Sequence, residues 1–109
     1  MNVSSVEYAL NIITGKWKLH IPLYLCQEQK IRFNELKRKL SGISNNALSK
    51  CLKELEDANV VQRIQYNEIP PKVEYSLTEL GKSLKPTMIS LGEWGKIAQG
   101  SAAQKSLNK

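Results

Sequence analysis

Hydrogen-bonding and positively charged side chains recur over residues 44–53, at a spacing that gathers them on one side of a helix. On a helical wheel of about 100° per residue, Asn46, Lys50 and Lys53 lie opposite the leucines of the same segment. An amide both donates and accepts hydrogen bonds and can read an adenine edge, whereas an ammonium group reaches guanine acceptors or a phosphate. The chemistry that this pattern favours is therefore recognition of a polyanion rather than the making of bonds.

Positive charge is concentrated in the same part of the chain. The 109 residues carry a net charge of +6, and residues 30–53 hold seven basic side chains against one acid, Glu35. A focused positive charge on a small domain is typical of a nucleic-acid partner, and a merely solvated basic surface is the alternative. Charge alone does not separate the two, so the elements that carry it must decide.

The inventory of reactive side chains argues against catalysis and against a metal site. His20 is the single histidine, and Cys26 and Cys51 lie far apart in the sequence. A structural zinc site needs about four ligands at close spacing, and no nucleophile–histidine order or glycine-rich phosphate loop stands out. We expect a non-enzymatic protein without cofactor or metal, in which both cysteines are small core residues. A sensor role for Cys51 is the minor alternative.

Composition indicates one soluble domain. Hydrophobic residues make up 41% of the chain and charged residues 24%, the balance of an ordinary globular protein. No stretch approaches 18 apolar residues, the length of a membrane span, and the first residues lack the basic and apolar regions of a secretory signal. We expect a cytoplasmic protein without membrane contact, with a single domain over 1–98 and a flexible tail over 99–109.

The elements that must position the polar segment are a series of short helices, indicated by apolar residues at a spacing of 3.6. Ser44 is placed to cap the helix of the polar segment, Ser4 or Ser5 the first helix, and Thr78 the last. Pro22 predicts a kink or a frayed start in the second helix, and Pro86 a bend or a break in the last. The expected helices span about 4–13, 16–27, 34–40, 45–58 and 79–94.

The period changes from 3.6 to 2 after Asn59, a residue that suits the left-handed conformation at a helix end. Alternating, β-branched residues predict strands over 60–66 and 73–77, and residues 31–33 form a short extended link. Two prolines between the strands lack N–H donors and predict a stiff hairpin tip. Helix, turn, helix and hairpin in this order predict a winged helix-turn-helix, mainly α with a small β-hairpin.

This fold gives each polar group an expected contact. The helix 45–58 would enter the major groove as the recognition helix, the preceding helix would cross the DNA backbone, and the wing 66–73 would lie at the minor groove. An ordinary solvated surface and a merely rigid turn are the alternatives. The recognition-helix contacts are Ser44, Asn45, Asn46, Ser49, Lys50 and Lys53. The backbone contacts are Arg32, Lys37, Arg38 and Lys39. The wing contacts are Arg63, Asn67, Pro70, Pro71 and Lys72.

The first and last helices carry more apolar surface than a chain of 12.3 kDa can bury. We expect them to form a homodimer interface, and a two-fold protein implies a palindromic binding site. Packing within one protomer is the alternative, and Trp17 is assigned to the core. The expected interface residues are Val6, Leu10, Leu84, Met88, Leu91 and Trp94.

Several short motifs support a family resemblance. They are Gly15-Lys16-Trp17, Arg32-Phe33-Asn34-Glu35-Leu36-Lys37, Gly42-Ile43-Ser44, Leu52-Lys53-Glu54-Leu55-Glu56, the run from Tyr66 to Gly81 with its paired prolines, and Glu93-Trp94-Gly95. Together they resemble, from about Ser4 to Gly95, the HxlR-type bacterial transcription regulators. The resemblance implies a homodimeric winged-helix protein related to the MarR-type regulators, acting on double-stranded DNA as a repressor or an activator. We expect a repressor.

The chain departs from that family at a position known for thiol chemistry. Several relatives sense oxidants through a Cys-Pro-Val-Glu motif ahead of the first helix, where this chain has Ser4-Ser5-Val6-Glu7. A serine hydroxyl cannot act as a low-pKa nucleophile, so this switch is not expected. Asn46 and Cys51 stand where many relatives carry basic residues, so the family's operators do not transfer. An unidentified small-molecule effector is left open, and the alternative function is protein or RNA interaction.

Overall fold

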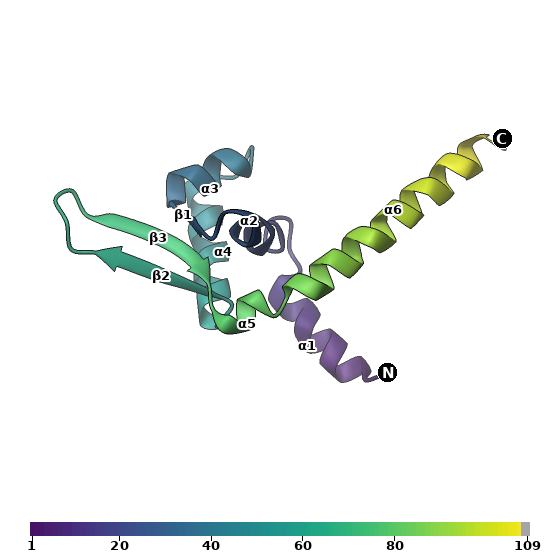
Figure 1. Cartoon of the computed structure of the whole chain (residues 1–109), viewed down its shortest axis with the longest axis horizontal. Helices are drawn as coiled ribbons and strands as arrows, with labels where there is room; N and C mark the ends of the chain where they lie inside the picture. Colours follow the sequence, from purple (N-terminus) through teal and green to yellow (C-terminus); the bar gives the residue numbers. More distant parts are fainter. Residues whose placement is uncertain (108–109) are drawn as a thin grey trace.

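The chain folds as helix, helix, strand, helix, helix, hairpin and two further helices (Figure 1). This computed structural model describes residues 1–107. Its elements are α1 (Val3–Ile13), α2 (His20–Glu28), β1 (Lys30–Ile31), α3 (Phe33–Lys39), α4 (Asn45–Asp57), β2 (Val61–Tyr66), β3 (Lys72–Leu77), α5 (Glu79–Lys82) and α6 (Lys85–Leu107). The order confirms a mainly helical winged helix-turn-helix, with α3 and α4 as the helix pair and β2–β3 as the wing.

The sheet has three antiparallel strands in the order β1-β3-β2, one more than the predicted hairpin. Lys30 pairs with Ser76 and Ile31 with Tyr75, so the expected extended link is a short edge strand. Two residues are too few to show the two-residue period that identifies a strand in a sequence. Their partner residues on β3 also lie more than forty positions further along the chain, so no local sequence pattern indicates the pairing.

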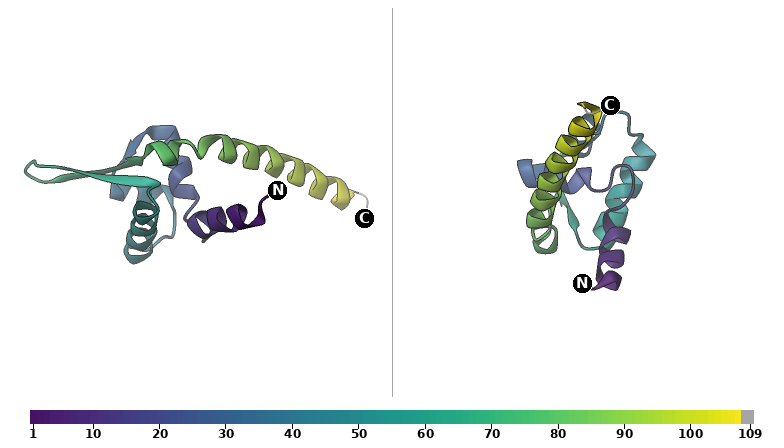
Figure 2. Two further views of the ribbon diagram at one scale, coloured as in Figure 1. Left: turned by 90° about the horizontal axis from the view of Figure 1, so that it is seen from below. Right: turned by 90° about the vertical axis from the view of Figure 1, so that its right-hand side faces the viewer.

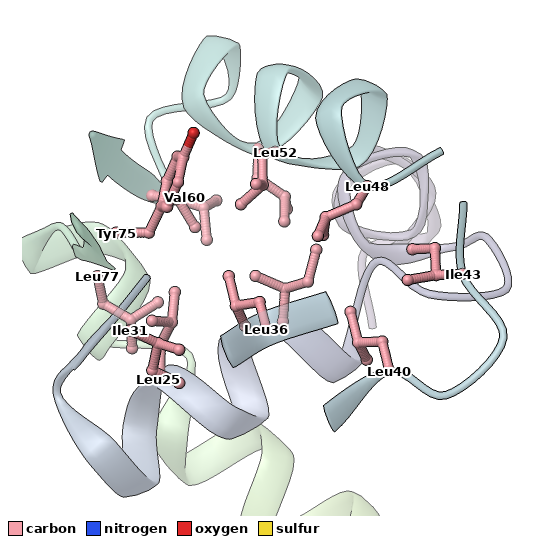
Figure 3. Packing of buried hydrophobic residues seen from close by; sticks show 13 residues of the cluster. Leu25, Ile31, Leu36, Leu40, Ile43, Leu48, Leu52, Val60, Tyr75 and Leu77 are labelled. Atoms are coloured by element: carbon pink, nitrogen blue, oxygen red, sulfur yellow. The ribbon is translucent and has the colours of Figure 1, made fainter. Parts of the chain in front are cut away.

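The hydrophobic core lies between α2, α3, α4 and one face of the sheet (Figure 3). Because strand side chains alternate between faces, Tyr75 and Leu77 of β3 point into the core, together with Ile31 of β1. Trp17 packs against this core as predicted, and so do Cys26 and Cys51. The three core leucines of α4 are at most 2% exposed and fix which side of α4 faces solvent; they are Leu48, Leu52 and Leu55.

Two helices begin at the caps that the sequence predicts, and two others begin at different residues. The Ser44 hydroxyl accepts a hydrogen bond from the Ala47 N–H at 3.1 Å, and Thr78 accepts one from the Gly81 N–H at 3.0 Å. Helix α1 is instead capped by Asn2, which precedes the expected Ser4 or Ser5. Helix α2 begins at His20 rather than 16, and Pro22 then sits in its first turn, where no intrahelical N–H bond is required.

The last helix is split, as the proline predicts: α5 ends at Lys82 and α6 begins at Lys85, with Pro86 in its first turn. Residues 99–107 of the expected tail are helical in α6, which extends further than the sequence analysis placed it. Alanine, glutamine and lysine dominate that stretch and favour a helix, and its one glycine costs only about 1 kcal/mol. Residues 108–109 of the expected tail lie outside the described residues, and the 1–98 domain boundary stays a prediction.

The molecule is elongated, with extents of 61 × 32 × 23 Å. Its radius of gyration is 16.6 Å, against about 13 Å for a compact domain of this length. Both chain ends lie opposite the wing tip, where α6 and α1 extend away from the core (Figure 2). No described helix combines the length and the apolar character that crossing a bilayer would require.

Candidate nucleic-acid interface

The solvent side of α4 presents the polar groups that the sequence singled out. The Ser44 cap fixes the helix start, and the buried leucines fix its rotation. All six expected side chains are exposed, and we call them the α4 polar face: Ser44, Asn45, Asn46, Ser49, Lys50 and Lys53. Burial of these groups against their own protomer would have excluded a binding role, and it does not occur.

The N-terminal half of α4 carries no acid, and two of the three acids in its C-terminal half, Glu54 and Asp57, are paired. The Glu54 carboxylate lies 2.9 Å from the Lys18 ammonium, and the hydrogen bond from Lys18 holds the pKa of Glu54 below its usual range. Asp57 lies 3.1 Å from Lys53 in an exposed pair and raises the pKa of that lysine, mainly through their hydrogen bond. Sequence reasoning missed Lys18, because only the packing of the α1–α2 turn brings it to α4.

Helix α3 and Arg32, the residue just before it, offer three unpaired cations rather than four among the residues described. Arg32 and Arg38 are exposed and Lys37 is half-buried, and none has a carboxylate within 4.0 Å among the residues described. Lys39 differs from the expectation, because its ammonium lies 2.6 Å from Glu28 and 5.4 Å from the centre of the Tyr24 ring. That lysine ties α3 to α2 in the free protein.

The wing extends away from the core and presents a mixed surface (Figure 1). Asn67, Pro70 and Pro71 at its tip are exposed. The exposed Arg63 donates a hydrogen bond to Gln65 at 3.2 Å. Lys72 is half-buried, with its ammonium 4.9 Å from the centre of the Tyr66 ring and 3.8 Å from Glu74. The tip and Arg63 are therefore more available to a partner than Lys72.

The expected interface residues lie on α1, on α6 or, for Leu84, just before α6, and they divide into three groups. Val6, Leu10, Leu91 and Trp94 are between 45% and 65% exposed, Leu84 is half-buried, and Met88 is only 7% exposed. The structure does not support Met88 as a dimer-interface residue. It lies near the start of α6, close to the winged helix-turn-helix (the winged unit), and is already buried within one protomer. Sequence reasoning also missed exposed apolar residues on both helices, among them Tyr8 at 72% and Ile97 at 69% exposure. Ile97 was overlooked because it falls where the last helix was expected to fray.

The cysteines show core packing rather than reactive chemistry. Cys51 is half-buried against the core, and its pKa is raised, first by burial and then by the nearby Glu54 carboxylate. A raised pKa disfavours the thiolate, which is the reactive form. Within residues 1–107 no group of three or more histidine, cysteine or acidic side chains is arranged to hold a metal ion.

Comparisons with known proteins agree with this geometry. The family model described as HxlR-like helix-turn-helix matches residues 12–102. An HTH-type transcriptional regulator of Halalkalibacterium halodurans is 49% identical over 88 residues, covering 81% of this chain and 78% of that protein. The HTH-type transcriptional regulator YybR of Bacillus subtilis is 45% identical over 91 residues, covering 84% and 72%. The crystal structure of a MarR-family regulator from Enterococcus faecalis has a TM-score of 0.86 and 38% identity, covering 95% of this chain and 94% of that one.

Proposed function

The chain belongs to the HxlR family of helix-turn-helix transcriptional regulators, and from this premise we propose that it binds a palindromic DNA operator as a homodimer and represses transcription there. A regulator of this family is not an enzyme. The α4 polar face carries the proposal: it is exposed, rich in amide and ammonium groups, and without an acid in the first turn of the helix.

Each part of the winged unit has a proposed contact. Helix α4 enters the major groove, where Asn46 and Lys50 reach base edges. Arg32, Lys37 and Arg38 bind phosphates and set the position of the protein without reading sequence. The wing tip approaches the minor groove. Lys39 is left out, because Glu28 already neutralises it.

The homodimer is supported by apolar surface that one protomer leaves uncovered. None of the residues of α1 is buried. Tyr8 on α1 and Trp94 and Ile97 on α6 are each more than 60% exposed. A second copy would cover them, and its recognition helix would meet the other half of a two-fold site. Repression is the direct consequence when such a site overlaps a promoter.

The proposal is tested by pairing a base-reading change with a phosphate-binding change. Genomic fragments bound by the protein would be selected first, and a promoter reporter carrying the best fragment would give the sign of regulation. In filter binding or anisotropy, Asn46→Ala should lose about 1–3 kcal/mol on that site and little on random duplex. Arg38→Ala should weaken both duplexes alike. Equal losses for Asn46→Ala on the two duplexes would remove it as a base reader.

Salt dependence separates DNA binding from the alternative of an RNA or protein partner. If about six to ten phosphates are contacted, affinity for duplex DNA should fall roughly 10³–10⁵-fold between 50 and 200 mM salt. A flat response, or tighter binding to structured RNA than to the selected duplex, would favour the alternative function.

A further inference from the structure

A groove of about 630 Å³ lies at the base of the wing, on the sheet face that points away from the core. The register places Lys30, Gln62 and Ser76 on one row of that face, since Ser76 pairs with both of the others. The end of α2 forms one wall, and α5 with the beginning of α6 forms the other. This volume is within the usual range for small-molecule sites.

The floor of the groove combines apolar side chains with one buried hydroxyl. The half-buried Ile64 and Cys26 side chains supply the apolar part, and the core residues Leu25 and Leu77, 2% and 5% exposed, contribute only their edges. Ser76 is only 7% exposed, and its oxygen accepts a hydrogen bond from the Gln62 amide at 3.0 Å. No acceptor for the Ser76 hydroxyl proton is recorded among residues 1–107, so this proton is available to a ligand oxygen.

The rim of the groove is cationic. Lys30, Lys82 and Lys85 line it, and none of its lining residues is acidic. Lys30 and Lys85 have no carboxylate within 4.0 Å in the described part of the chain. Lys82 lies 3.2 Å from Glu79, in a pair whose side chains are 63% and 93% exposed. An exposed pair of this kind exchanges easily for a better-placed anion.

We propose that this groove binds an organic anion, a carboxylate with a hydrocarbon body. The carboxylate would lie between the lysines of the rim, and the hydrocarbon would cover Ile64 and the Cys26 side chain. A polar group with no hydrophobic part would leave that floor unused, and a neutral hydrocarbon would leave the charges of Lys30 and Lys85 without a partner.

The groove is separate from the α4 polar face, because Lys30, Gln62 and Ser76 lie on the sheet face opposite to the one that packs on the core. A bound ligand would contact β3 of the winged unit and the first turn of α6 at once. Binding itself requires no DNA, so this inference stands or fails independently of the proposed operator binding.

The test uses the full chain and the fluorescent probe anilinonaphthalene sulfonate, an aromatic anion. We expect one probe molecule per protomer, displaced by sodium octanoate and not by octanol. The variant Lys30→Gln/Lys85→Gln should bind the probe about tenfold or more weakly. Its matched control is Lys96→Gln/Lys105→Gln, which removes two charges from α6 outside the groove and should bind as the wild type does. Circular dichroism would verify that both variants are folded.

Three results would overturn the inference. Equal weakening in the two variants would place the probe on the apolar faces of the terminal helices. Displacement by octanol as effective as by octanoate would remove the requirement for an anion. Displacement by a random DNA duplex would make the groove a phosphate contact.

Discussion

Lys53 shows how a neighbouring acid can limit a residue on the α4 polar face. Its ammonium lies 3.1 Å from Asp57, one turn further along α4. A phosphate must compete with that carboxylate for the lysine, and the carboxylate itself repels DNA. We expect Asp57→Asn to tighten binding to any duplex roughly two- to fivefold at low salt, with the gain fading as salt is raised. Anisotropy titrations at two salt concentrations would measure it.

The matched control for that change is Glu79→Gln. It also breaks an exposed lysine–carboxylate pair and removes one negative charge, but on α5 rather than α4. It should leave duplex affinity within about twofold of the wild type. If both variants gain the same affinity for duplex DNA, the cause is the change in net charge and not the release of Lys53.

The Lys18–Glu54 pair makes stability depend on pH. Lys18 lowers the pKa of Glu54 in the folded chain, so the pair stabilises the fold above the unfolded pKa of about 4.3, and this contribution is lost as pH falls through the folded pKa. We expect Glu54→Gln to lower the free energy of unfolding at neutral pH, with the difference from wild type shrinking below about pH 4. Urea unfolding at a series of pH values measures it. In a Lys18→Gln background the pH-dependent part should vanish; a difference that stays constant with pH contradicts the assignment.

The sequence predicted the exposure of residues within a single helix well. It predicted side-chain ion pairs between two different helices poorly. The exposure of Asn46 and Lys50 follows from the leucine spacing of α4 alone, and the structure agrees. Lys39 was misjudged because its partner, Glu28, lies on another helix. Side-chain pairs between elements depend on how the elements pack, which no local period reports.

At the scale of elements, the junction between the wing and α5 depends on Gly81. A Cβ at this position would lie 2.1 Å from the Val60 carbonyl oxygen and 2.9 Å from a Leu77 methyl carbon. The backbone oxygen cannot move without disturbing the start of the wing. We expect Gly81→Ala to lower the free energy of unfolding by about 3 kcal/mol, at the upper end for overpacking. Urea unfolding at fixed protein concentration would measure it.

Gly100→Ala is the matched control, because a Cβ there meets open space within the chain. Alanine favours a helix interior over glycine, so this variant should be as stable as the wild type or up to about 1 kcal/mol more stable. Similar losses for the two variants would show that the methyl group at Gly81 meets no obstacle.

Elements long enough to show a repeating pattern or a local cap were predictable from the sequence. Elements that depend on residues far away in the chain were not. The caps at Ser44 and Thr78 mark helix starts by local chemistry, and Pro86 marks the break between α5 and α6. Strand β1 has only two residues and depends on β3 for its hydrogen bonds. The end of α6 was placed too early because Gly95 and Gly100 suggested fraying, although the residues around them favour a helix.

For the whole molecule, the elongated shape is itself an argument for a second copy. Apolar side chains of α1 and α6 remain exposed in the protomer even though the core beside them is complete. We expect a solution mass near twice the 12.3 kDa of one chain, measured by light scattering or sedimentation. Association should not require DNA, because the exposed apolar surface lies at the opposite end from the wing tip (Figure 2).

The same surface predicts which variant becomes monomeric. Leu91→Asp/Trp94→Asp places acids at positions that are 50% and 65% exposed in one protomer, and a dimer would bury four such side chains. Because these side chains are already partly covered in one protomer, their loss amounts to about 4 kcal/mol, or roughly a thousandfold in the dimer Kd. The control Ile69→Asp puts the same charge on the fully exposed wing tip and should stay dimeric. The monomeric variant should also bind a palindromic operator no more tightly than a single half-site, since the second recognition helix is no longer attached. A double variant that keeps the dimer mass would show that the two copies meet elsewhere.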